Sequence, residues 1–224
     1  MAPRRGHFSA ELFRFLRELA RNNSRDWFQA NRERYEKALR EPCLSFVSDA
    51  GPALRGVSRE IVADPRPVGG SLFRIYRDTR FSKDKSPYKT HAGMYFPLRA
   101  GKDVHTPGFY LHLEPGGCFA AAGLWHGDAP ALAKVRGAIA ERPNDWKKAC
   151  GRLPLQGDAL SRPPRGFDAS HPFIEDIKRK DFITSVRFSD KDVAGPRFLS
   201  AFAAACRKMS PLPKFLAKAL DLSW

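Results

Sequence analysis

The spacing of apolar residues alternates between a helical and a strand period along the chain, and this change is the feature that most constrains the fold. Near the N-terminus apolar side chains recur at the helical period, at Phe8, Leu12, Phe15, Leu16 and Leu19. Ser9 is placed to cap this helix. From Ser71 the period becomes two, as in strands, and the helical period returns near the C-terminus.

The first 55 residues predict three helices. A second helix is expected after the cluster at residues 22–24, with an inner face formed by Trp27, Phe28, Asn31, Tyr35 and Leu39. A third is expected from Pro42 to about Leu54, followed by a loop rich in Gly and Pro at residues 56–70.

The central part of the chain predicts at least four strands, mostly antiparallel. Residues 72–77 alternate, residues 91–100 are rich in aromatics, and residues 108–125 read as a hairpin around Pro115-Gly116-Gly117. A last strand is expected at residues 181–188. Further helices are expected at residues 128–140, 143–150, 174–179, 198–208 and 213–220.

Helices at both ends of a central antiparallel sheet indicate an α+β fold. With 224 residues and 42% hydrophobic content the chain is long enough to bury a full core. We expect one domain over residues 1–224, with C-terminal helices at residues 196–220 packed on the rest.

The formal net charge of +15 favours acidic partners, such as nucleic acid, nucleotides, phosphorylated metabolites or anionic lipid. A general bias toward basic residues would give the same total. Four dispersed cysteines fit neither a disulfide scaffold nor a zinc knuckle, so a reducing cytoplasm is expected. No apolar run approaches the ~18 residues of a membrane span, and integral membrane association is not expected. The oligomeric state is left open.

The most charged stretch is the loop RDTRFSKDKSPYKT, residues 77–90. Its cations are Arg77, Arg80, Lys83, Lys85 and Lys89, and two acidic residues, Asp78 and Asp84, interrupt them. Guanidinium and ammonium groups bind phosphate or carboxylate, and the two aspartates can hold neighbouring cations in one rotamer. The sequence therefore predicts an anion site here, with an ordinary solvated loop as the alternative.

Two other segments are expected to complete a composite site with this loop. The first is Trp27 and Asn31 on the second helix, with Tyr35 as a further candidate, and the second is Arg162, Arg165 and His171. The alternatives are core packing for Trp27 and Tyr35, a satisfied core amide for Asn31, and a stiff surface loop for the two arginines.

Catalytic and metal signals are sparse. His105, His112, Glu114 and His126 lie on or beside the hairpin, and alternation places His112 and Glu114 on the face of Tyr110. Their spacing matches no familiar metal pattern, so neither a metal nor a cofactor is predicted. Asp78 or Asp84 is a candidate base and Tyr88 a candidate acid, although a carboxylate beside arginines is a weak base.

Residues 73–96, FRIYRDTRFSKDKSPYKTHAGMYF, together with residues 11–36, GLWHG and PPRGFDASHPF, resemble a bacterial and fungal family known as domain of unknown function 2461. The resemblance covers about Phe8 to Phe188. It implies a single α+β domain and carries no established reaction, cofactor or catalytic residue.

Three functions follow as hypotheses. The leading one is binding of a phosphate-bearing or other anionic ligand, with nucleic acid or a nucleotide favoured. The second is an enzyme acting on a small anionic substrate. The third is an internal ion-pair network that clamps the sheet to the helices without any ligand.

Overall fold

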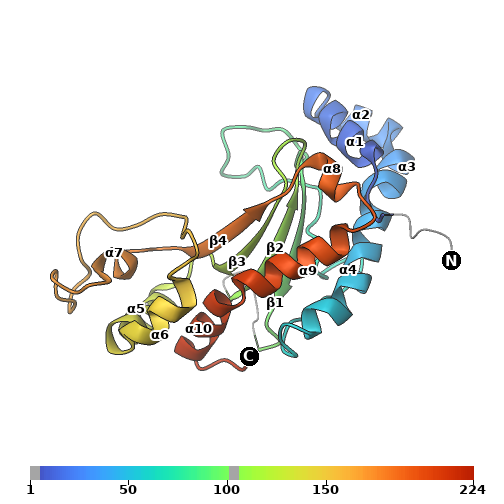
Figure 1. The fold of residues 1–224 in the computed structure, drawn as a ribbon. Helices are drawn as coiled ribbons and strands as arrows, with labels where there is room; N and C mark the ends of the chain where they lie inside the picture. Colours follow the sequence, from blue (N-terminus) through green and yellow to red (C-terminus); the bar gives the residue numbers. More distant parts are fainter. Residues whose placement is uncertain (1–5, 101–105) are drawn as a thin grey trace.

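A four-stranded antiparallel sheet organises the computed structural model, which describes residues 6–100 and 106–224 (Figure 1). The strand order is β1-β2-β3-β4, so each strand pairs with its neighbours in sequence. Their bounds are β1 (Ala92–Pro97), β2 (Gly108–Leu113), β3 (Phe119–Leu124) and β4 (Phe182–Arg187). Helices precede, interrupt and follow these strands, and the expected α+β class is confirmed.

The N-terminal helices differ in two details from those expected: the second helix is broken at Asn31, and no break precedes Pro42, because Arg40 and Glu41 keep helical backbone angles. They are α1 (Ala10–Arg21), α2 (Arg25–Ala30), α3 (Arg32–Tyr35), the π-helical turn η1 (Glu36–Arg40) and α4 (Glu41–Arg55). The helix expected to run from Trp27 to Leu39 without interruption is broken at Asn31. The side-chain amide of Asn31 donates to the carbonyl of Trp27 at 2.9 Å, and Asn31 caps the C-terminus of α2.

The remaining helices were largely predictable. They are α5 (Ala129–Glu141), α6 (Pro143–Cys150), α7 (Ile174–Ile177), α8 (Asp190–Val193), α9 (Phe198–Met209) and α10 (Pro211–Ala219). The side chain of Asp128 accepts from the backbone N–H of Ala131 and caps α5, as its position before Pro130 predicts. No helix of the described ranges is long and apolar enough to cross a membrane.

The expectation of a regular strand at residues 72–77 is wrong. Leu72 and Tyr76 each form one isolated bridge, to Met94 and to Tyr88. The segment pairs with β1 at Phe73, whose N–H donates to Gly93 at 2.9 Å, and then turns to pair with residues 87–89. Because its partner changes after a few residues, no continuous ladder forms.

One face of the sheet is buried against α4 and α9 (Figure 1). Met94, Phe96, Phe109 and Leu111 point to this side and are fully buried. At the other end of the strands, Leu124 and Phe182 join a second apolar cluster with Trp146 of α6 and Phe215 of α10. These contacts hold the sheet rigid, so that the side chains on its other face have fixed positions.

Candidate functional site

The sheet face opposite α4 and α9, called here the cavity face, is defined by strand register. Tyr95 lies opposite Tyr110, which lies opposite Ala121, and in the next row Gly108 lies opposite Gly123. Small residues therefore form a floor beside two large aromatic residues. Alternation along each strand puts all of these side chains on one side.

A cavity of about 530 Å³ occupies this face. It is lined by Phe73, Lys89, His91, Tyr95, Gly108, Tyr110, Phe119, Ala121, Ala122, Gly123, Trp125 and Ile183. Most of these side chains are apolar or aromatic, and a few polar groups converge among them, which is the usual composition of a small-molecule site.

Glycines make room for the two tyrosine rings. A Cβ atom at position 93 would lie 2.6 Å from the hydroxyl oxygen of Tyr110, and one at position 108 would lie 2.9 Å from that of Tyr95. Each tyrosine thus lies across a glycine of the neighbouring strand. Their hydroxyl positions depend on these two glycines.

Lys89 supplies the cation of the cavity. Its Nζ donates to the backbone carbonyl of Arg74 at 3.0 Å and lies 5.5 Å from the centre of the Phe73 ring. Within the described ranges no carboxylate forms an ion pair with it. Burial, and secondarily the charge of Arg74, lower the pKa of Lys89. The ammonium is therefore partly desolvated, and no carboxylate of the described residues neutralises it.

His91 lines the cavity beside Lys89. Burial, with a further contribution from His112, lowers the pKa of His91 to about 4. Its imidazole is therefore neutral at neutral pH. The ring of His91 lies 4.4 Å from that of His112, centre to centre.

A hydrogen-bonded chain leads away from the cavity along β2. The hydroxyl of Tyr110 lies 3.0 Å from Nδ1 of His112, and Nε2 of His112 lies 3.2 Å from a carboxylate oxygen of Glu114. Burial, and then the charge of Glu114, raise the pKa of Tyr110 to about 12. The predicted placement of His112 and Glu114 on the face of Tyr110 is confirmed.

The hairpin histidines do not assemble into a metal site in the described part of the chain. No group of three or more His, Cys, Asp or Glu residues there is arranged to hold a metal ion. His126 instead pairs with Asp181, at 2.9 Å between Nδ1 and Oδ1. His105 lies outside the described residues.

The charged loop forms local ion pairs. Asp78 accepts from the guanidinium of Arg80 at 2.7 Å, and Asp84 pairs with Arg77, so the predicted bracing of cations by the two aspartates is confirmed. Nζ of Lys85 donates to the carbonyl of Thr79 at 2.9 Å. Arg80, Lys83 and Lys85 are exposed, and Lys89 is the basic residue of this loop that lines the cavity.

The candidate catalytic residues of the loop lack suitable properties. Hydrogen bonds from the Arg80 side chain and backbone lower the pKa of Asp78 to about 2. Hydrogen bonds from Ser86 and from Arg77 hold the pKa of Asp84 well below its usual range. Both are weak bases at neutral pH. Tyr88 is buried and stacked on Phe28, with ring centres 4.1 Å apart.

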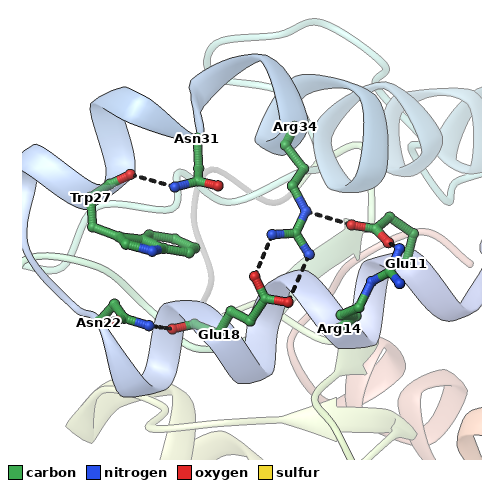
Figure 2. Close-up of polar contacts among 7 residues, drawn as sticks. All are labelled: Glu11, Arg14, Glu18, Asn22, Trp27, Asn31 and Arg34. Carbon is green, nitrogen blue, oxygen red and sulfur yellow. Dashed lines mark hydrogen bonds and ion pairs between the residues drawn. The ribbon is translucent and has the colours of Figure 1, made fainter.

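Trp27 and Asn31 contribute to helix packing (Figure 2). Besides the bond from Asn31 to the Trp27 carbonyl, the Trp27 ring packs 5.8 Å from that of Phe15. Nearby, Arg34 bridges α3 to α1 through ion pairs with Glu11 and Glu18, including a hydrogen bond of 3.1 Å to Glu18. Tyr35 is buried between Phe15 and Phe28.

The third segment of the predicted composite site, with Arg162, Arg165 and His171, lies elsewhere in the fold. Arg162 and Arg165 are exposed in the segment that leads to α7, at the left of Figure 1, whereas α2 lies at the upper right. Nδ1 of His171 accepts from the backbone N–H of Phe173 at 3.1 Å. The composite site expected from the sequence is therefore not assembled as a whole. The loop does lie against α2, where Tyr88 stacks on Phe28 and its backbone N–H donates to Asn23 at 3.1 Å. The segment with Arg162, Arg165 and His171 lies away from both (Figure 1).

Sequence reasoning missed most of the cavity. His91, Tyr95, Phe119 and Trp125 were not among the predicted site residues. The available signal was the pattern of small and aromatic residues at alternate positions in β1, β2 and β3, as in GMYF and FAAAG.

Comparison with models of protein families matches residues 11–215 to the family described as "Conserved hypothetical protein (DUF2461)". The matched range begins three residues after Phe8 and extends past Phe188, where the predicted resemblance ended, to include α9 and most of α10. A search of curated proteins found no match.

Proposed function

The chain belongs to the DUF2461 family, and we propose from its cavity that the protein binds a small organic anion with a flat apolar body. The aromatic and small side chains of the cavity face would contact the body of the ligand. The ammonium of Lys89 would pair with its negative charge.

One observation carries this proposal: a half-buried ammonium at the wall of an apolar cavity, without a carboxylate partner in the described ranges. Removing a charge from water costs free energy unless an opposite charge compensates for it. An anionic ligand would supply that compensation. Arg74 and Arg77, whose charges act on Lys89 and His91, add positive potential nearby.

The chemistry of the cavity restricts the class of ligand. Aromatic walls favour planar groups, which stack on Phe or Trp rings. One cation in the cavity suits a carboxylate, a sulfonate or a phosphate monoester. A mononucleotide meets both conditions, with its base among the rings and its phosphate near Lys89.

The test uses two probes that share one apolar body. The dye 8-anilino-1-naphthalenesulfonate carries one negative charge, and N-phenyl-1-naphthylamine is its neutral counterpart. We expect the wild-type protein to bind the sulfonate, with affinity reduced about tenfold in Lys89→Met, which keeps an unbranched side chain of nearly the same length and removes the charge. Affinity for the neutral dye should not change.

Two further variants serve as controls. Lys83→Met removes an exposed loop cation and should leave both affinities unchanged. Ala121→Leu adds volume to the cavity floor and should weaken the binding of both probes. Equal losses of sulfonate affinity in Lys83→Met and Lys89→Met would reject the specific role of Lys89. The hypothesis that the ligand is a mononucleotide is tested by measuring the affinities for adenosine monophosphate and adenosine by calorimetry in the same variants.

A second candidate is single-stranded nucleic acid bound by the charged loop. The observation that favours it is Phe81, which is 95% exposed beside the cations of the loop, with the Arg80 guanidinium 5.7 Å from its ring centre. Exposed aromatic rings among cations stack on bases. Affinity for a labelled oligothymidine should then fall steeply with salt, and the slope should decrease in Arg80→Ala.

A further inference from the structure

The hydrogen bonds along β2 fix the tautomer of a neutral His112. Glu114, when ionised, has only acceptor atoms, so Nε2 of a neutral His112 bears the hydrogen in their 3.2 Å contact. Nδ1 then has a lone pair. The hydroxyl of Tyr110, 3.0 Å away, therefore donates to Nδ1. This is the arrangement in which an imidazole removes a proton from a hydroxyl group, with a carboxylate orienting the ring.

This row of hydrogen-bonded side chains, Tyr110, His112 and Glu114, connects the cavity with solvent. Tyr110 lines the cavity. The His112 side chain is only 12% exposed, because it lies between the rings of His91 and Phe119, at 4.4 and 4.8 Å. The Glu114 side chain at the other end is 44% exposed. A proton released inside the cavity would thus reach a side chain in contact with water.

We propose that Tyr110 is an acid–base group of the cavity, with His112 as the base behind it and Glu114 as the residue that positions His112. In the forward step, the Tyr110 oxygen takes a proton from the bound organic anion while its own proton passes to Nδ1 of His112. The ligand gains one negative charge and His112 becomes an imidazolium. The proposal rests on the proposed function, because the ligand in the cavity is the proton donor.

The electrostatics of the cavity favour this step. The ammonium of Lys89 stabilises negative charge that develops on the ligand. Glu114 stabilises the imidazolium. His91, with its pKa lowered to about 4, stays neutral and does not repel the imidazolium. Because the pKa of Tyr110 is raised to about 12, its hydroxyl stays protonated until His112 accepts the proton.

Tyr95 provides a matched comparison within the same cavity. It pairs with Tyr110 across β1 and β2, and its ring also lies over a glycine. Its hydroxyl donates to the backbone carbonyl of Thr106, which does not act as a base. The two tyrosines both line the cavity, and their hydroxyls donate to different groups, a backbone carbonyl and the His112 ring.

The test is acetylation of the full chain by N-acetylimidazole, with the modified tyrosines identified by peptide mass spectrometry. The Tyr110 oxygen attacks the acetyl carbon, its proton passes to His112, and imidazole leaves with a proton taken from solvent. We expect Tyr110 to react at least about tenfold faster than Tyr95, and His112→Asn to remove this difference. Equal rates for the two tyrosines in the wild type would overturn the proposal.

The positioning role of Glu114 needs a separate readout. Glu114→Gln should reduce the acetylation rate of Tyr110, and ¹⁵N NMR of His112 should change from one tautomer to a mixture, since an amide both donates and accepts. A single unchanged tautomer together with an unchanged rate would exclude Glu114 from this role. This variant also keeps the test available if His112→Asn does not fold.

The proposed proton transfer from Tyr110 to His112, called here the relay, and the proposed ligand binding can be rejected by different results. Acetylation is measured without a ligand, so it reports on Tyr110 and His112 alone. Binding of 8-anilino-1-naphthalenesulfonate reports on the cavity and Lys89. Loss of sulfonate binding with fast acetylation of Tyr110 would reject the ligand class and retain the reactive hydroxyl, and the reverse result would reject the relay.

Discussion

At the scale of single residues, the shape of the cavity depends on glycines, whose missing side chains leave room for the tyrosine rings. Gly93 lies directly below the hydroxyl of Tyr110, and a Cβ there would also lie 3.1 Å from the Phe73 ring. A larger residue at this position would displace both rings. The position of the Tyr110 hydroxyl is thus set by a neighbouring strand as well as by its own.

The first prediction concerns this glycine. We expect Gly93→Ala to lower the free energy of unfolding by about 1–3 kcal/mol, since an added methyl in a packed site forces its neighbours to move. It should also slow acetylation of Tyr110. Urea denaturation measures the first effect and peptide mass spectrometry the second.

Gly137 in α5 gives the matched control. Apart from the backbone of its own helix and its two chain neighbours, a Cβ at this position meets no atom within 4 Å. Gly137→Ala should therefore stabilise the protein by up to about 1 kcal/mol, because alanine favours helix more than glycine does. If both variants lost similar stability, the steric account of Gly93 would be wrong.

At the scale of elements, a buried carboxylate joins three segments near the edge strand β4. Asp181 is 3% exposed and accepts from the backbone N–H groups of His126, at 2.8 Å, and Asp158, at 3.0 Å. It also pairs with the His126 imidazole. These bonds fix the end of β3, where Trp125 borders the cavity.

The second prediction concerns Asp181. Burial raises its pKa, but the hydrogen bonds from His126 and Asp158 more than offset this, and the pKa is lower than usual. We expect Asp181→Asn to cost about 2–3 kcal/mol at neutral pH, because charged hydrogen bonds are lost. Denaturant unfolding at several pH values measures this cost.

The sign of the pH dependence follows from the lowered pKa. The folded-state carboxylate contributes stability above the unfolded pKa of about 3.9, and this contribution is lost as pH falls through the folded-state pKa. The difference between wild type and Asp181→Asn should shrink below about pH 4. Asp158→Asn changes an exposed side chain and should alter stability by less than about 0.5 kcal/mol. A constant difference down to pH 2 would contradict the role of the charge.

Element-level features were predictable where the signal is local. The cap at Ser9, the hairpin around Gly116 and the bracing of loop cations by Asp78 and Asp84 follow from nearby residues. The break at Asn31 was not predicted, because the apolar period continues through it. The segment at residues 72–77 alternates like a strand, yet its pairing changes partner, which depends on the distant residues 87–94.

At the scale of the whole molecule, the site results from having helices on one face of the sheet. The expected fold class was predictable because the hydrophobic periods alone indicate helices around an antiparallel sheet. The site was not, since the cavity joins residues from all four strands and from the loop that contains Lys89. Charge density favoured the loop from Arg77 to Lys89, and of its predicted cations Lys89 lines the cavity, whereas the others largely point to solvent or to the aspartates.

The most direct test of the account is to locate a bound anion by NMR. Amide shifts of ¹⁵N-labelled protein titrated with 8-anilino-1-naphthalenesulfonate should change most at Lys89, His91, Ala121 and Gly123, around the cavity. Lys89→Met should weaken these changes without moving them. Changes confined to residues 77–86 would place the anion on the exposed loop and contradict the cavity as the binding site.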